Sequence, residues 1–353
     1  MDQFLPTSVS AWLRRQGPDA DVVMSSRVRL ARNFAGFQFV NRCSTADRQA
    51  VLTAAQKCIM SADLADHMVW VNLNTVPPIQ RRVLVERRLI SAQLAAGEEP
   101  RAVAVATPNE EFAVMINEED HLRMQSIRPG FDLEEAFNAI DAADDRLEGR
   151  ADFAFHPRFG FLTACPTNVG TGIRISVMLH LPALKMSGEL DKVQRAAKAM
   201  SLAVRGSFGE GSDASGDIFQ ISNQTTLGKS EREFLEDFRA RIIPRVIAYE
   251  RDARQQLVSK RRVFLEDQVH RALGVLRSAR LLKAEEAMQL ISNVRLGVAA
   301  GVVELPITKL NELTLLVQPA HLQRHVGRAL EQSERRVERA TLCRGYLGVS
   351  TSD

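Results

Sequence analysis

Residues 173–181 read Ile173-Arg174-Ile175-Ser176-Val177-Met178-Leu179-His180-Leu181, and every second residue in this stretch is aliphatic. Side chains alternate between the two faces of a β-strand, so the stretch is predicted to be a strand with its aliphatic face in the core. The opposite face carries Arg174, Ser176, Met178 and His180. A buried strand would therefore hold Arg174 in a fixed position.

A second stretch of this kind is Ser25-Ser26-Arg27-Val28-Arg29-Leu30-Ala31-Arg32, which follows a short apolar run. If it is extended, Arg27 and Arg29 lie on the same face, because side chains two residues apart point the same way. Two planar cations would then face one ligand.

Apolar runs and amphipathic stretches outside these two segments predict the remaining secondary structure. The runs at 68–73, 103–106, 112–116 and 218–221 are expected to be strands. The stretches at 47–60, 81–96, 132–147 and 188–204 are expected to be helices. Strand signals stop after Glu231, and charged amphipathic segments follow at 269–282, 284–294 and 308–316. The pattern predicts an α/β or α+β catalytic body followed by a helical region, joined by a continuous helix near 230–255.

Composition limits the classes of function. The chain has 353 residues, 45% of them hydrophobic, and 46 basic against 43 acidic residues give a net charge of +3. Such a balance does not indicate a nucleic-acid or membrane partner. The four cysteines are widely spaced, and neither a signal peptide nor a membrane-spanning run is recognisable, so we expect a cytoplasmic protein without a metal site. Gly228-Lys229-Ser230 resembles the end of a P-loop, but Asn223 replaces the first glycine.

Two further arginines lie in segments rich in acids or glycines. Arg123 ends Asn117-Glu118-Glu119-Asp120-His121-Leu122-Arg123, and Arg205 opens Arg205-Gly206-Ser207-Phe208-Gly209-Glu210-Gly211. Arginine is always charged and binds phosphate through two hydrogen bonds at once, so several converging arginines suit a triphosphate. For any one of them alone, a solvated or ion-paired surface residue remains the more common alternative.

Acidic residues in the same segments suit a guanidinium ligand. Glu118, Glu119 and Glu210 could orient a guanidinium group and accept its proton while nitrogen attacks phosphorus. The alternative is that they cap helices or pair with nearby arginines. Cys165, in Cys165-Pro166-Thr167-Asn168, stands among turn residues and could line a substrate site.

Together these stretches resemble the phosphagen (guanidino) kinase family, and within it the bacterial protein-arginine kinases. That branch is indicated by Val83-Leu84-Val85-Glu86, Ile221-Ser222-Asn223-Gln224, Leu227-Gly228-Lys229-Ser230, Val294-Arg295-Leu296-Gly297 and Leu310-Asn311-Glu312-Leu313. The resemblance implies an α+β fold, an antiparallel sheet flanked by helices as in the guanidino kinase and glutamine synthetase catalytic domains. It implies an N-terminal helical segment (1–20), a catalytic domain (21–240) and a helical dimerisation and regulatory domain (241–353).

The resemblance also implies functional residues. Glu119 and Glu210 would be the catalytic carboxylates, and Cys165 would line the substrate site. Nucleotide contacts would come from Ser25, Ser26, Arg27, Val28, Arg29, Arg88, Arg123, Arg174, Ile175, Ser176, Val177, Met178, Arg205, Gly206, Ser207, Phe208, Gly209 and Glu210. The expected reaction transfers the γ-phosphate of ATP, with Mg²⁺ held mainly through phosphates and water, to arginine side chains of proteins.

Partners are likewise implied by the resemblance. They are protein substrates with exposed arginine, a second copy of the chain in a homodimer, a zinc-binding activator protein, a heat-shock repressor and a Clp chaperone. In this family branch phosphoarginine marks proteins for degradation by a Clp protease. Neither direct nucleic-acid binding nor membrane binding is expected.

Two positions depart from the family pattern. Arg88, in Glu86-Arg87-Arg88-Leu89-Ile90-Ser91, stands where relatives have histidine near the nucleotide. In the tail, Arg335-Arg336-Val337-Glu338-Arg339-Ala340 replaces an Arg-Asp-x-x-Arg-Ala motif that binds phosphoarginine, so Arg335 and Arg339 are retained and the acid is lost. We expect weaker or altered phosphoarginine binding there. Two other functions remain open: a kinase of free arginine or another small guanidine, and a catalytically silent phosphoarginine-binding adaptor.

Overall fold

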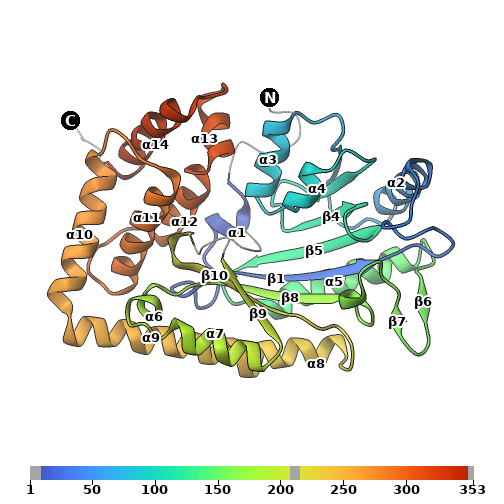
Figure 1. Cartoon of the computed structure of the whole chain (residues 1–353), viewed down its shortest axis with the longest axis horizontal. Helices are drawn as coiled ribbons and strands as arrows, with labels where there is room; N and C mark the ends of the chain where they lie inside the picture. The colour runs from blue at the N-terminus through green and yellow to red at the C-terminus, as the bar shows by residue number, and fades with distance from the viewer. Residues whose placement is uncertain (1–8, 207–214, 349–353) are drawn as a thin grey trace.

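The computed structural model describes residues 9–206 and 215–348, and its centre is an eight-stranded sheet in which every pair of neighbours is antiparallel (Figure 1). The strand order is β2-β3-β4-β5-β1-β8-β10-β9. The strands are β1 (Val23–Arg32), β2 (Met68–Asn72), β3 (Ala102–Ala106), β4 (Phe112–Ile116), β5 (Leu122–Pro129), β8 (Ile173–His180), β9 (Leu202–Gly206) and β10 (Ile218–Asn223). A small hairpin, β6 (Phe155–His156) and β7 (Gly160–Phe161), stands apart. The predicted antiparallel α+β fold is confirmed.

Helices cover both faces of the sheet and form the last third of the chain. Those of the first part are α1 (Ala11–Arg14), α2 (Thr45–Met60), α3 (Pro78–Glu86), α4 (Ala92–Ala96), α5 (Leu133–Glu148), α6 (Pro182–Met186) and α7 (Leu190–Ala199). Those that follow the sheet are α8 (Glu231–Glu236), α9 (Ile243–Lys260), α10 (Arg262–Ser278), α11 (Ala284–Ala299), α12 (Ile307–Leu316), α13 (Pro319–Val326) and α14 (Gln332–Leu347). One π-helical segment, η3 (Asp237–Ile242), joins α8 to α9, so the chain stays helical from Glu231 to Lys260. The domain boundaries remain a prediction.

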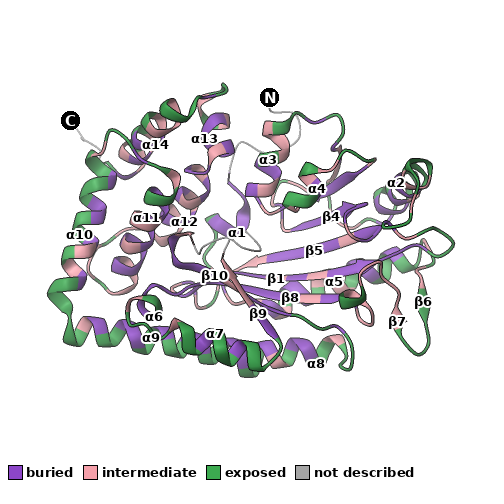
Figure 2. Cartoon of the chain, viewed as in Figure 1, coloured by how far each residue is buried: buried purple, intermediate pink, exposed green. Residues whose placement is uncertain are grey.

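One face of the sheet is entirely core. Val28, Ile175 and Val177 pack there against the apolar sides of α2 and α5. Figure 2 shows the same division along α9 and α10, where buried and exposed residues alternate. In the described ranges no helix combines the length and the apolar character needed to cross a lipid bilayer.

The other face is divided into three zones. At the β2–β4 end, a small core that includes Val103 and Met115 is covered by α3 and α4. At the far end, Met178 and Ile218 pack against helices of the last third of the chain, in a core shared with α1. Between these two covered zones lies a polar strip of the sheet, and the arginines of the sequence motifs point into it.

Two predicted helices were wrong in part. The expected helix 81–96 is broken into α3 and α4 at Arg88, whose φ of 63° is incompatible with a continuing right-handed helix. The expected helix 188–204 contains α7, but its end is strand β9. Ser201, with φ 56°, reverses the chain there, and residues 202–206 pair with β10 at the edge of the sheet. Local periodicity did not reveal this pairing, because it is made with residues far along the chain.

Candidate active site

The polar strip is built from neighbouring strands whose side chains point the same way. Arg27 and Arg29 of β1 lie between Arg174 and Ser176 of β8 on one side and Arg123 and Gln125 of β5 on the other. Register puts Arg29 opposite both Arg174 and Gln125, and Arg27 opposite Ser176. Four arginines from three strands therefore meet on one face. Alternation in the sequence predicted the shared face of Arg27 and Arg29 and the strand position of Arg174, and the sheet order adds Arg123.

Arg27 is held by neutral partners. Its Nη2 donates to Gln220 Oε1 at 2.9 Å, and its Nε donates to Ser176 Oγ at 3.3 Å. Burial, and then the positive charges of Arg88, Arg123 and Arg174, lower the pKa of Arg27 to about 9. Like charges that are held together in this way favour a bound anion, because it would relieve their mutual repulsion.

Arg29 is affected in the same way as Arg27. Burial, followed by the charges of Arg27, Arg123 and Arg174, lowers the pKa of Arg29 well below its ordinary value, although Glu118 acts in the opposite direction. Its buried Nε has no hydrogen-bond partner among the described residues. Buried donors are normally satisfied, so this nitrogen fits a ligand oxygen such as that of a phosphate.

Glu118 and Glu119 follow β4 and occupy different positions relative to Arg123. Glu118 Oε2 accepts from Arg123 Nη1 at 2.5 Å, whereas Glu119 Oε2 lies 3.8 Å from the same nitrogen. The Glu118 side chain is 2% exposed and that of Glu119 is 37% exposed. Burial, the largest single influence, opposes ionisation of Glu118, but the Arg123 charge and the hydrogen bonds from Ser91, Arg123 and the Glu119 main chain together lower the pKa of Glu118. Glu118 therefore fixes the position of Arg123, and Glu119 is left to face a ligand.

Buried hydrogen bonds position the loop that carries these carboxylates. Asp120 accepts from Asn33 Nδ2 at 2.8 Å and from the main-chain nitrogen of Ala164 at 2.7 Å. Asn168 Nδ2 donates to Asp120 at 3.2 Å and reaches Glu119 Oε2 at 3.4 Å. These contacts join the loop after β4 to the segment around Cys165.

A cavity of about 380 Å³ opens beside this loop. We call it the acceptor-side cavity. Its lining residues are Val40, Asn41, Arg48, Gln93, Glu118, Glu119, Ala164, Cys165 and Pro166. Cys165 thus shares a cavity with Glu119, as a substrate-lining residue must. Its thiol is within 3.0 Å of the Thr167 hydroxyl.

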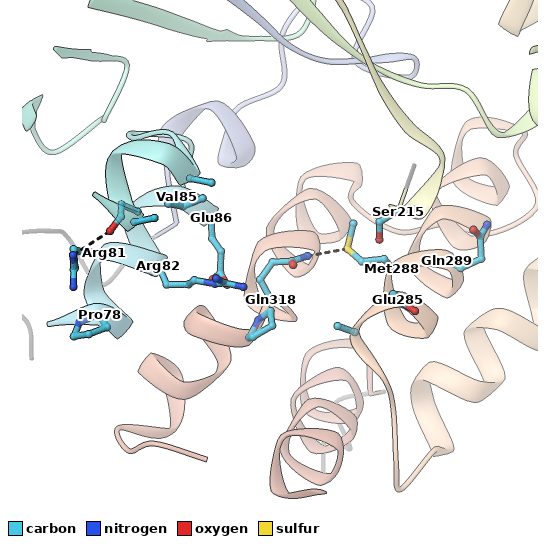
Figure 3. A pocket seen from close by; sticks show the side chains of 16 residues that line it. Pro78, Arg81, Arg82, Val85, Glu86, Ser215, Glu285, Met288, Gln289 and Gln318 are labelled. Carbon is cyan, nitrogen blue, oxygen red and sulfur yellow. Dashed lines mark hydrogen bonds between the residues drawn. The ribbon is translucent and has the colours of Figure 1, made fainter. Parts of the chain in front are cut away.

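On the other side of the arginines, the sheet meets the helices of the last third of the chain. Arg88 and Met178 line a narrow pocket there, together with Glu86, Met288 and Gln318. Glu86, Met288 and Gln318 also line a much larger cavity of about 1000 Å³, which lies between α3 and α4 on one side and α11 and α13 on the other (Figure 3). The narrow pocket and the large cavity therefore adjoin. In Figure 3 the side chain of Gln318 extends toward Met288, to whose sulfur its Nε2 donates at 3.3 Å. A nucleotide on the arginine strip would thus have open space next to Arg88.

Not every residue predicted to bind nucleotide projects into the strip. Ser26 donates from Oγ to the carbonyl of Gly130, and Val28, Ile175 and Val177 pack in the core on the opposite face. Ser25 is buried. Arg205 lies opposite Gln220 in the β9–β10 pair, and Gly206 follows it. Ser207, Phe208, Gly209 and Glu210 lie outside the described residues.

The two tail arginines are far along the chain on α14. Arg339 is buried, and it donates to the carbonyls of Val317 at 2.7 Å and Leu282 at 3.0 Å. Arg335 Nη1 donates to the carbonyl of Leu330 at 2.6 Å. In this structure both arginines bind the carbonyl ends of neighbouring segments, and their role in binding phosphoarginine remains a prediction.

Sequence reasoning missed three residues of the site. Gln220 binds Arg27, Gln125 Nε2 donates to the carbonyl of Arg88 at 2.6 Å, and Arg48 lines the acceptor-side cavity. Alternation along 218–221 would have placed Gln220 on one face of its strand, but which strand it faces depends on the sheet order. Arg48 lies on a helix whose own sequence carries no motif, so only the tertiary structure places it.

Comparison with known proteins gives matches over nearly the whole chain. The family ATP:guanido phosphotransferase, C-terminal catalytic domain, matches residues 50–253, and the Protein-arginine kinase McsB C-terminal domain matches residues 262–353. The chain is 44% identical to the protein-arginine kinase of Geobacillus thermodenitrificans, covering 98% of this chain and 96% of that protein. It is 42% identical to that of Bacillus subtilis with the same coverage, and 45% identical to that of Symbiobacterium thermophilum, with 98% and 99% covered.

Solved structures share the fold at lower sequence identity. The crystal structure of lombricine kinase superimposes with a TM-score of 0.57 at 23% identity, covering 70% of this chain and 71% of that one. The substrate-free duplicated taurocyamine kinase from Schistosoma mansoni gives a TM-score of 0.57 at 21% identity, covering 78% of this chain and 42% of that one.

Proposed function

The chain belongs to the ATP:guanido phosphotransferase family, in which it is a protein-arginine kinase, and from this premise we propose how its site divides the work. The arginine strip binds the triphosphate of ATP, and Glu119 and Glu210 hold the guanidinium of an arginine side chain in a protein. The observation that carries this proposal is the cluster itself, in which burial and the charges of Arg123 and Arg174 act on Arg27 and Arg29 and lower the pKa of both. Phosphoryl transfer depends mainly on alignment and charge neutralisation, which such a cluster provides.

Glu119 acts on the acceptor. Its half-exposed carboxylate lines the acceptor-side cavity, so it can orient a guanidinium entering there and take its proton as the nitrogen attacks the γ-phosphorus. Glu118 keeps Arg123 in place on the nucleotide side. The matching role of Glu210 rests on its motif alone.

We propose Mg²⁺ as the companion of ATP. This ion usually keeps several waters and binds through substrate phosphates. The partly exposed carboxylate of Glu119 offers a hard oxygen acceptor for one of those waters, so the residues present fit the ion. Bound there, Mg²⁺ would neutralise charge on the phosphates.

The wider role proposed here follows that of the family branch. Phosphoarginine made by the chain would mark proteins for a Clp protease during stress, with a zinc-binding activator and a heat-shock repressor as partners. The chain would act as a homodimer in the cytoplasm, and Arg335 and Arg339 would sense phosphoarginine. The names of the curated relatives support the protein substrate, and the rest remains proposal.

One competition experiment tests the acceptor. The chain is incubated with Mg-ATP, a folded protein rich in exposed arginine and an excess of free arginine, and acid-labile phosphate is measured on each. Label on protein arginine is the expected result. Label on free arginine alone would contradict the proposal, and label on neither would favour a silent adaptor.

A further inference from the structure

Among its lining residues the acceptor-side cavity has one cation besides two carboxylates. Glu118 and Glu119 form its acidic wall, and Arg48 of α2 lies on the lining as well. Nothing in the arginine strip requires Arg48, because Arg48 does not contribute to the pKa shifts of Arg27 or Arg29. Arg48 is therefore a cation on the side where the protein substrate enters.

The position of Arg48 is fixed relative to the catalytic loop. Its Nη2 donates to the carbonyl of Val40 at 2.7 Å, which turns the guanidinium toward another residue of the lining. Its own carbonyl accepts from Asn117 Nδ2 at 2.9 Å. Asn117 directly precedes Glu118, so the first turn of α2 and the carboxylate loop are tied together.

The charge of Arg48 is not neutralised by its surroundings. The adjacent acid, Asp47, accepts instead from the main-chain nitrogen of Ser44 at 2.9 Å and from its hydroxyl at 2.7 Å, in the N-terminal cap of α2. No carboxylate of residues 9–206 or 215–348 forms an ion pair with Arg48. Arg48 is half-buried, so water screens it only in part. A half-buried guanidinium with donors to spare suits a carboxylate ligand.

We propose that Arg48 forms a subsite for an acidic side chain close to the target arginine in the protein substrate. The inference rests on the proposed function and adds a sequence preference to it. The target guanidinium would bind at Glu119 while a neighbouring aspartate or glutamate of the substrate binds at Arg48. Asn41 and Gln93, both exposed on the same lining, would supply hydrogen bonds to the substrate main chain.

The test uses three peptides that share one arginine and differ beside it, carrying aspartate, alanine or lysine. The measured quantity is the ratio of kcat/KM between peptides on the same enzyme preparation, which does not depend on the folded fraction. Wild type should prefer the aspartate peptide to the alanine peptide by about two- to fivefold, as expected of a partly exposed ion pair. The preference should shrink with added salt.

Variants then assign the preference to Arg48. Arg48→Gln should abolish it, and Arg48→Glu should invert it in favour of the lysine peptide, while KM for ATP stays unchanged. Arg42→Glu is the matched control. It makes the same change in net charge as Arg48→Glu, but Arg42 is exposed and does not line the cavity. It should keep the wild-type preference.

Two outcomes separate this inference from the function on which it rests. Peptides phosphorylated with no preference, or with a preference that Arg48→Glu leaves intact, would overturn the subsite and leave the kinase standing. If Arg48→Gln lost phosphorylation of free arginine while the preference among peptides stayed the same, Arg48 would be the residue that binds the α-carboxylate of free arginine. This outcome would also overturn the subsite. No transfer to any peptide would overturn both.

Discussion

At the scale of single residues, adjacent glutamates in the same loop differ because of one arginine. Glu118 is buried against Arg123, whereas Glu119 lies farther from Arg123 and its partly exposed carboxylate lines the acceptor-side cavity. The sequence offered both as candidates, and the family motif selected Glu119. The catalytic role of Glu119 remains a prediction, and it is the better candidate because a carboxylate already paired with Arg123 is poorly placed to take a proton from a substrate.

Glu119→Gln should lower kcat by roughly 10²- to 10⁴-fold, as is typical when a positioned acid or base is removed, with little change in ATP affinity. Glu118→Gln should instead raise KM for ATP, because Arg123 loses its partner. Steady-state kinetics separates the two patterns. Glu134→Gln, at an exposed ion pair with Arg232, is the charge-matched control. Equal kinetic signatures for Glu118→Gln and Glu119→Gln would refute the division of roles.

Arg123→Ala should weaken nucleotide affinity and turnover together, since Arg123 is expected to touch phosphate in both the ground and the transition state. Loss of one charge-assisted hydrogen bond is worth about 1.5–3 kcal/mol, which is roughly tenfold or more in affinity. Arg205→Ala should have the same effect as Arg123→Ala. Arg205→Lys should restore little of the activity that Arg205→Ala loses, because the lysine ammonium cannot form the two parallel hydrogen bonds of a guanidinium. Calorimetry with an ATP analogue measures the affinity, and full activity in Arg205→Lys would show that a point charge is enough.

At the scale of elements, the strands were predictable and the breaks between elements were not. Alternation identified β1 and β8 and the face that carries Arg27, Arg29 and Arg174, because one buried face imposes a strict two-residue period. The same reasoning placed Met178 and His180 with Arg174 on the face opposite the aliphatic side chains. In the structure both are buried, because helices of the last third of the chain cover that end of the sheet.

Glu250 illustrates a link between elements that no local pattern could reveal. Glu250 lies on α9, and its carboxylate accepts hydrogen bonds from the main-chain nitrogens of Ala183 at 3.1 Å and Leu184 at 3.0 Å, at the start of α6. It also accepts from Arg254 Nε at 2.7 Å, and it is fully buried. One carboxylate thus caps a helix that lies far from it in sequence.

Glu250→Ala should lower the free energy of unfolding by about 3–5 kcal/mol, since it removes the cap of α6 and takes from the buried Arg254 its 2.7 Å partner, leaving it the Asp21 carboxylate at 3.7 Å. Glu266→Ala removes one partner of an exposed pair with Arg262 on α10 and should cost less than about 1 kcal/mol. Urea denaturation of the two variants provides the comparison. Similar losses in both would show that Glu250 contributes no more than a surface ion pair.

At the scale of the whole molecule, buried polar contacts join the helical region to the sheet on which the site is built. His180 of β8 bonds to Ser292 of α11 at 2.8 Å. Glu86, two residues before Arg88, accepts from the main-chain nitrogens of Ala320 and His321 and from His321 Nδ1. The helices thus hold the residues beside the nucleotide side of the site, although the sequence placed them in a separate region.

Stability should fall as pH drops below the ordinary histidine pKa of about 6.5. Burial lowers the pKa of His121, His180 and His321, so the unfolded chain binds more protons than the folded chain in this range. Burial raises the pKa of Asp144 and Glu250, which acts in the opposite direction but in a more acidic range. Urea midpoints across this range measure the slope, and His180→Gln should flatten it. Stability that rises on acidification from neutral pH would contradict this reading of the histidines.

The central claim is that ATP on the arginine strip phosphorylates arginine in proteins with Glu119 facing the acceptor. Its most direct test is site-resolved mass spectrometry of a protein substrate, kept near neutral pH after incubation with Mg-ATP and either wild type or Glu119→Gln. We predict phosphate on arginine side chains with wild type and almost none with Glu119→Gln, although both bind ATP equally. Phosphate on other residue types only, or undiminished phosphoarginine with Glu119→Gln, would contradict the account.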